Sequence, residues 1–142
     1  MKRLLLLGGG HAHVHVLKTL HDAPIADVKV TLVTPYARQV YSGMLPGWVA
    51  GHYSIEQCVI PLPPLCEQAG VNFRQVAATH INLAEKQVTC ADGSRVAFDI
   101  LSIDTGPVAD LSMIPGAQRH GISVRPLEKF IEACSDALKD VS

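Results

Sequence analysis

The sequence predicts an α/β fold in which a parallel β-α-β unit comes first and a three-stranded antiparallel β-meander is inserted later in the chain. The opening apolar run, Leu4–Leu7, stops at three glycines, and helical periodicity begins directly after them. A second, β-branched run, Val28–Val33, completes the unit. Further on, Asp92-Gly93 separates two short strand-like pieces and is typical of a hairpin turn, because glycine accepts a positive φ.

Each element has a local signal of its own. Leu4–Leu7 lacks polar alternation, as expected for a strand that is covered on both faces. The helix is predicted from His11 to Asp22, since Val16 and Leu20 are four residues apart and a proline follows its end. After a loop rich in proline and glycine, we expect short helices around Trp48–Gly51 and Leu65–Ala69, and strands at Val71–Ala77, Thr79–Leu83, Gln87–Cys90, Arg95–Phe98 and Ile100–Asp104.

The remaining segments are less regular. The run from Ile60 to Pro64 contains too much proline for the interior of a helix, and Pro107 to Gly121 is expected to be irregular. Leu127 to Leu138 is an amphipathic helix. Its apolar stripe consists of Phe130, Ile131, Cys134 and Leu138. Without a partner domain this stripe would expose apolar surface and favour self-association through the C-terminal helix.

Composition excludes several classes of protein. The 142 residues are 48% hydrophobic and 18% charged, which is enough for one buried core and too apolar for a disordered chain. A formal net charge of -1 disfavours nucleic-acid binding and a polybasic membrane anchor. No apolar run approaches the roughly 20 residues of a membrane span. Four cysteines without C-x-x-C spacing predict buried thiols in a reduced, cytoplasmic protein.

The first glycine turn reads Gly8-x-Gly10-x-x-His13 between a strand and a helix, which is the context that a dinucleotide-binding fingerprint requires. Gly8 permits a turn that other residues would strain, and Gly10 lets the backbone approach a pyrophosphate. The helix then offers free N–H groups and its positive dipole end to that anion. The pattern predicts a Rossmann-like sheet with a dinucleotide at the turn, and a tight turn without a ligand is the alternative.

Two positions depart from the fingerprint. His13 stands where glycine or alanine normally allows close packing, so the helix should sit further from the sheet or the imidazole should turn aside. An imidazole that filled the turn would exclude a phosphate there. The second strand is followed by Thr34 where a carboxylate normally binds ribose hydroxyls. Because Thr34 would not repel a 2′-phosphate and Arg38 is close in sequence, an NADP-type site stays open.

Three histidines alternate at the start of the helix. His11 and His15 are four residues apart, a workable spacing for zinc ligands. No carboxylate or thiol is close in sequence, and the helix start is already assigned to phosphate. We therefore expect no metal site, and a metal-binding module at His11, His13 and His15 is the weakest of the hypotheses.

Three stretches together resemble one family. They are Gly8 to Val14 (GGGHAHV), Tyr41 to Gly47 (YSGMLPG) and Ile103 to Gly106 (IDTG). They are similar to the FAD-dependent pyridine nucleotide-disulfide oxidoreductase superfamily, in particular to type II NADH dehydrogenase-like proteins, including those fused to selenide, water dikinase. The resemblance covers nearly the whole chain and implies an incomplete FAD-binding domain that carries the inserted meander.

The resemblance also implies cofactor contacts residue by residue. The glycine turn and the amides after it would bind the FAD pyrophosphate, Thr34 would lie at the adenosine ribose, and Ala77 would contact adenine through its backbone. Gly43 stands where the family has a lysine beside the flavin, so that lysine is missing. The implied cofactor-binding residues are Gly8, Gly9, Gly10, His11, Ala12, Thr34, Pro35, Arg38, Ser42, Met44, Leu45, Pro46, Ala77, Asp104, Thr105 and Gly106.

No second G-x-G-x-x-G and no redox C-x-x-x-x-C follows the first turn. We therefore expect residues 1–125 to be the N-terminal part of an FAD-binding domain and residues 126–142 to be a helix leading toward a missing NAD(P)H-binding domain. The implied function is a part of a flavin-dependent NAD(P)H oxidoreductase with a quinone or another diffusible acceptor, at the inner membrane face in the full-length protein. No catalytic side chain is evident, so the chain alone should be inactive. The alternative is a non-redox Rossmann-like module that binds NAD(P) or another nucleotide.

Overall fold

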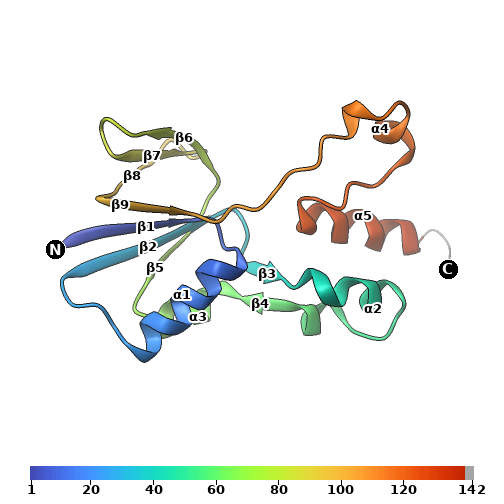
Figure 1. The fold of residues 1–142 in the computed structure, drawn as a ribbon. Coiled ribbons are helices and arrows are strands. Elements are labelled where there is room, and N and C mark those ends of the chain that lie inside the picture. Colours follow the sequence, from blue (N-terminus) through green and yellow to red (C-terminus); the bar gives the residue numbers. More distant parts are fainter. Residues whose placement is uncertain (140–142) are drawn as a thin grey trace. The chain divides into compact units, whose positions relative to one another are not determined.

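The structure is a computed structural model that describes residues 1–139, and these residues form two compact units (Figure 1). The first unit contains Met1–Gln39 and Ile60–Thr105. The second unit contains Val40–Val59 and the described residues from Gly106 onward. The glycine turn and the sheet both belong to the first unit.

A four-stranded parallel sheet organises the first unit, with strand order β5-β2-β1-β9. These strands are β1 (Lys2–Leu7), β2 (Val28–Thr34), β5 (Asn72–Gln75) and β9 (Ile100–Ile103). Helices α1 (His11–Asp22) and α3 (Leu62–Gln68) pack on one face of the sheet. The antiparallel meander packs on the other face and consists of β6 (Ala78–Asn82), β7 (Gln87–Cys90) and β8 (Arg95–Ala97).

Alternation along the strands divides the core between the two faces. On the helix side, Leu6 and Leu32 pack with Leu17 of α1, and all three are at most 1% exposed. On the meander side, Leu5 and Val33 pack in a separate cluster with the strands of the meander. Because both faces are covered, the central strands read as continuous apolar runs, which is the signal that the sequence gives for them.

The second unit consists of one longer helix, α5, and several short helical elements. They are η1 (Ser42–Met44), α2 (Leu45–Val49), η2 (Ile55–Cys58), η3 (Leu111–Met113), α4 (Ala117–His120) and α5 (Leu127–Lys139). Leu127 and Ile131 of α5 are buried against Val40 and Leu45. The side chain of Leu138, which we expect in the apolar stripe of this helix, lies outside the described residues.

The fold class predicted from the sequence is confirmed: the sheet is parallel and the meander is a separate antiparallel sheet. The first helix runs over the predicted residues. The helix expected at Leu65–Ala69 begins earlier, because α3 starts at Leu62 and places Pro63 and Pro64 in its first turn, where no intrahelical N–H is needed. The segment expected to be irregular contains η3 and α4.

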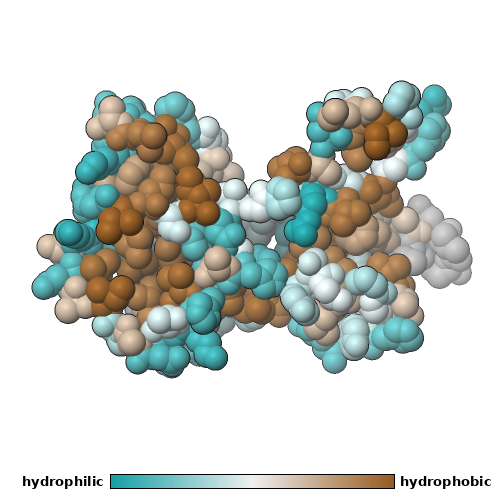
Figure 2. Space-filling model, in the orientation of Figure 1, coloured by the Kyte–Doolittle hydropathy of each residue, from teal (hydrophilic) through white to brown (hydrophobic). Residues whose placement is uncertain are grey.

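Pairing between two short strands was missed from the sequence. β3 (Arg38–Val40) and β4 (Val59–Pro61) form a two-stranded sheet, and each is too short to show a period-two pattern. No helix among residues 1–139 is long and apolar enough to cross a membrane. Apolar residues reach the surface over the strands of the first unit (Figure 2). They include Ile100 and Ile103 of the edge strand β9, which are 52% and 57% exposed.

We predict that Cys66 is unreactive in the folded protein. Burial raises the pKa of its thiol to about 11, so at pH 8 only about one molecule in a thousand carries the reactive thiolate. Iodoacetamide should therefore modify Cys66 far more slowly than the half-buried Cys134, as measured by peptide-resolved mass spectrometry. Equal labelling rates of the two cysteines at pH 8 would contradict the packing of α3 against the sheet.

Candidate functional site: the glycine turn at the start of α1

The turn between β1 and α1 is held by the strands on both sides of it. Gly8 has φ +93°, a left-handed conformation that favours glycine. Its N–H donates to the carbonyl of Val33 at 2.8 Å. A Cβ on Gly8 would overlap the backbone carbonyl of Asp104 at the end of β9. The turn therefore lies at the carboxyl edge of the sheet, where ligands bind in parallel α/β folds.

Asp104 provides an anion to the amino end of α1. Its carboxylate Oδ2 accepts the backbone N–H of His13 at 3.1 Å, and its carbonyl accepts the N–H of Gly10 at 3.1 Å. A Cβ on Gly10 would overlap this carboxylate, so the close approach requires glycine. The helix has no side-chain cap and no acidic residue in its first turn. Asp104 therefore acts as a cap from a strand distant in sequence.

His13 fills the space beneath the turn. The side chain is 2% exposed, with Nδ1 2.6 Å from the carbonyl oxygen of Gly8 and Nε2 2.9 Å from the hydroxyl of Ser102. Because a carbonyl only accepts, Nδ1 carries the proton and donates to Gly8. The histidine thus neither turns aside nor occupies the outer face of the turn. It replaces the close packing of a glycine with two hydrogen bonds that join α1, the turn and β9.

The N–H of Ala12 remains for a ligand. Among the described residues it has no acceptor, whereas the N–H groups of Gly10 and His13 are both bound by Asp104. An N–H in the first turn of a twelve-residue helix lies in the positive field of the helix dipole. The arrangement is suited to an oxyanion. The carboxylate of Asp104 already makes one such contact, because it accepts the N–H of His13.

Thr34 lies beside the turn. It ends β2, is 4% exposed, and its Oγ1 accepts a long hydrogen bond of 3.4 Å from the N–H of Tyr36. This hydroxyl would be 3.6 Å from a Cβ on Gly9, so the threonine and the glycine turn are neighbours. Pro35 is exposed and its carbonyl accepts from Gln75 at 3.5 Å.

The other predicted site residues of the first unit follow the carboxyl ends of the sheet strands β2, β5 and β9. Arg38 begins β3 and is half-buried. Ala77 lies between β5 and β6, and its carbonyl already accepts the N–H of Ala91 at 2.8 Å. Thr105 is exposed directly after Asp104. These positions remain predictions as cofactor contacts.

The remaining predicted site residues belong to the second unit. Ser42 and Met44 lie in η1, and Leu45 and Pro46 begin α2. The side chain of Leu45 is 4% exposed and packs in the core of this unit, so packing accounts for it. Gly106 has φ +76°, a conformation that favours glycine.

The three histidines do not gather. The ring of His13 faces the sheet, whereas His11 and His15 are exposed, and Nδ1 of His11 is 3.2 Å from Nε2 of Gln39. Within residues 1–139, no group of three or more histidine, cysteine or acidic side chains could hold a metal ion. Ser102 was missed from the sequence, because nothing in an apolar strand marks a single serine as the partner of a buried imidazole.

Two curated proteins are similar to this chain in sequence. The chain is 26% identical over 106 residues to the sulfide-quinone reductase of Aquifex aeolicus, covering 75% of this chain and 24% of that protein. It is 28% identical over 137 residues to the NADH dehydrogenase-like protein YutJ of Bacillus subtilis, covering 93% of this chain and 37% of that protein. No family model matches the sequence.

Solved structures show the same fold. The sulfide:quinone oxidoreductase of Aquifex aeolicus superposes with a TM-score of 0.81 at 22% identity, over 98% of this chain and 32% of that one. NDH2 of Plasmodium falciparum in complex with NADH gives a TM-score of 0.74 at 19% identity, over 92% of this chain and 27% of that one. These comparisons confirm the resemblance to the FAD-dependent pyridine nucleotide-disulfide oxidoreductase superfamily. The chain spans only 24% and 37% of the length of the two curated relatives.

We predict that His13→Ala destabilises the fold by about 2–4 kcal/mol, because it leaves a cavity and removes the donor to a buried carbonyl. The exposed His15 on the same helix provides the matched control, and His15→Ala should change the free energy of unfolding by less than about 0.5 kcal/mol. Urea denaturation of the two variants measures the difference. Equal losses would show that the His13 hydrogen bonds do not join the helix to the sheet.

Proposed function

We propose that this chain is the N-terminal, FAD-binding part of a flavin-dependent NAD(P)H oxidoreductase whose electrons pass to a quinone or another diffusible acceptor. The observation that carries the proposal is the turn from Gly8 to Ala12 at the carboxyl edge of the sheet, with an anion-binding helix end and an open amide at Ala12. The relatives named above are a sulfide-quinone reductase and an NADH dehydrogenase-like protein, and both names describe electron transfer.

The residues of the turn fit a pyrophosphate. The chain passes the helix end without a side chain at positions 8–10, and a carboxylate already occupies part of the same positive field. The amides of His11 and Ala12 would hold the phosphate oxygens, and Thr34 would face the adenosine ribose from the end of β2. Bound FAD would supply the hydride-accepting chemistry, while the protein supplies position and electrostatics.

Asp104 sets the electrostatic condition for that binding. Its carboxylate lies on the same helix end and competes with phosphate for the positive field. Like charges at close range repel by about 1 kcal/mol even in water. Binding of a dinucleotide to this chain should therefore be weaker than the glycine turn alone would allow.

The two-part organisation inferred from the sequence is part of the proposal: residues 1–125 as the N-terminal part of the FAD domain and residues 126–142 as the approach to an NAD(P)H domain. Two observations support it. The relatives are roughly three to four times as long as the matched region. In addition, β9 is an edge strand with exposed isoleucines at Ile100 and Ile103, as expected where a sheet continues.

A non-redox module for NADP or another nucleotide is the second candidate. The observation that favours it is the absence of a carboxylate at the end of β2, where Thr34 stands and Arg38 follows within the first unit. A 2′-phosphate would meet no repulsion at Thr34. The two candidates differ in which dinucleotide binds more tightly.

We predict that Ala12→Pro weakens FAD binding about tenfold to a hundredfold, because it removes one N–H that would donate to a charged phosphate. Proline is tolerated in the first turn of a helix, as Pro63 and Pro64 of α3 show in this same fold. Ala12→Ser keeps the N–H and is the matched control, with binding within about twofold of the parent chain. Quenching of flavin fluorescence measures the affinity, and circular dichroism checks the fold.

Calorimetric titrations of the chain with FAD and with NADP separate the two candidates. Tighter binding of FAD than of NADP, with both weakened in Ala12→Pro, supports the flavoprotein. Binding of NADP alone would replace it with the non-redox module, and equal affinities of Ala12→Pro and Ala12→Ser for FAD would remove the turn from the site altogether.

A further inference from the structure

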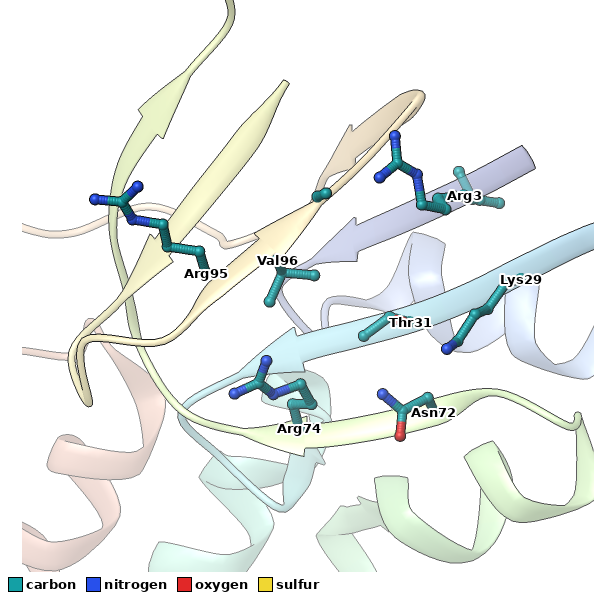
Figure 3. Close-up of a pocket in the computed structure, with 9 residues that line it drawn as sticks. Arg3, Lys29, Thr31, Asn72, Arg74, Arg95 and Val96 are labelled. Carbon is teal, nitrogen blue, oxygen red and sulfur yellow. The ribbon is translucent and has the colours of Figure 1, made fainter. Parts of the chain in front are cut away.

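A second polar site lies on the opposite face of the parallel sheet from α1. The meander packs over Leu5, Leu7 and Val33, toward the carboxyl ends of the central strands. Toward the amino ends, the same face is open and carries a recess of about 260 Å³ (Figure 3). It is lined by Arg3, Leu4, Lys29, Thr31, Asn72, Arg74, Arg95, Val96 and Ala97. We call this the basic recess.

Strand register brings the basic side chains of the recess together. Arg3 of β1 lies directly beside Lys29 of β2, and Thr31 lies beside Asn72 of β5. Because side chains alternate along a strand, Arg3, Lys29 and Thr31 share the face on which Leu5 and Leu7 contact the meander. The parallel register therefore places two cations, Arg3 and Lys29, next to each other at the amino end of the sheet.

Carboxylates balance only part of this charge. Arg3 makes a two-pronged ion pair with Asp99, at 2.8 and 3.1 Å, and these hydrogen bonds lower the pKa of Asp99, so the carboxylate stays ionised. Arg74 donates to Ser94 at 2.7 Å and is 3.7 Å from Asp92. Within residues 1–139, the side chain of Lys29 has no ion-pair or hydrogen-bond partner.

The guanidinium of Arg95 in β8 likewise has no ion-pair or hydrogen-bond partner among the described side chains. In Figure 3 its guanidinium extends outward at the rim of the recess, while Lys29 and Arg74 extend over the sheet. Four cations and two carboxylates leave two positive charges at the recess. A phosphoryl group carries about −1.5 to −2 charges at neutral pH, which matches that excess.

We propose that the basic recess binds a small anionic ligand of the phosphate class. Lys29 contributes an unpaired charge over the sheet, Arg95 adds positive charge at the rim, and Thr31 and Asn72 place polar groups next to Lys29. The volume is below the roughly 300–1,000 Å³ of drug-sized sites, so the ligand is a phosphate or a short polyphosphate group rather than a whole dinucleotide. This site is separate from the glycine turn, which lies at the other end of the strands.

Residue-resolved NMR titration of the 142-residue chain with inorganic tripolyphosphate tests the proposal. Saturable shifts are expected at the amides of Lys29, Thr31, Asn72 and Arg95. Lys29→Gln should weaken the binding about tenfold, since it removes a charge-assisted contact. Lys18→Gln removes an equal charge from the exposed face of α1 and should leave the affinity within about twofold.

Four outcomes would overturn the proposal. One is shifts that grow linearly with tripolyphosphate and spread over all lysines and arginines, which is general salt screening. Another is equal weakening in Lys29→Gln and Lys18→Gln. The third is tighter, saturable binding of hexaglutamate at the same amides, which would make the recess a docking surface for an acidic segment. Shifts confined to Gly8–Ala12 would place tripolyphosphate at the proposed dinucleotide site and also contradict this one, while FAD binding is measured separately.

Discussion

The hydrogen bonds around the start of α1 are the constraint on which the rest of the first unit depends. Asp104 at the end of β9 binds the N–H groups of Gly10 and His13, while the buried imidazole of His13 binds the carbonyl of Gly8 and the hydroxyl of Ser102. These contacts join residues about 90 positions apart in sequence. They fix the helix end at the carboxyl edge of the sheet, where its dipole and its open amide face any ligand.

Much of this fold could be predicted from the sequence because the signals are local. The apolar runs of the central strands, the periodicity of α1 and the Asp92-Gly93 turn each report one physical requirement, and the structure agrees with all of them. The beginning of α3 was misjudged because proline excludes itself from the interior of a helix but not from the first turn. Short β3 and β4 carry too few residues for any pattern.

The candidate site was only partly predictable, because its main contacts are between distant segments. The glycine spacing located the turn, yet nothing near His13 in the sequence indicated that its imidazole would form a hydrogen bond with Ser102. The family resemblance implied Asp104 as a cofactor contact, and in the structure its carboxylate caps α1. The basic recess has no motif at all: Arg3 and Lys29 become neighbours only through the parallel register of β1 and β2.

The central claim is that a pyrophosphate binds at the amino end of α1, and NMR titration of the isotope-labelled chain with FAD tests it most directly. The account predicts that the largest amide shifts occur at Gly10, His11 and Ala12. A shift at Asp104 is also expected, because bound phosphate would compete with its carboxylate for the amino end of α1. Saturable binding of FAD that leaves these amides unmoved would contradict the account, whatever the affinity.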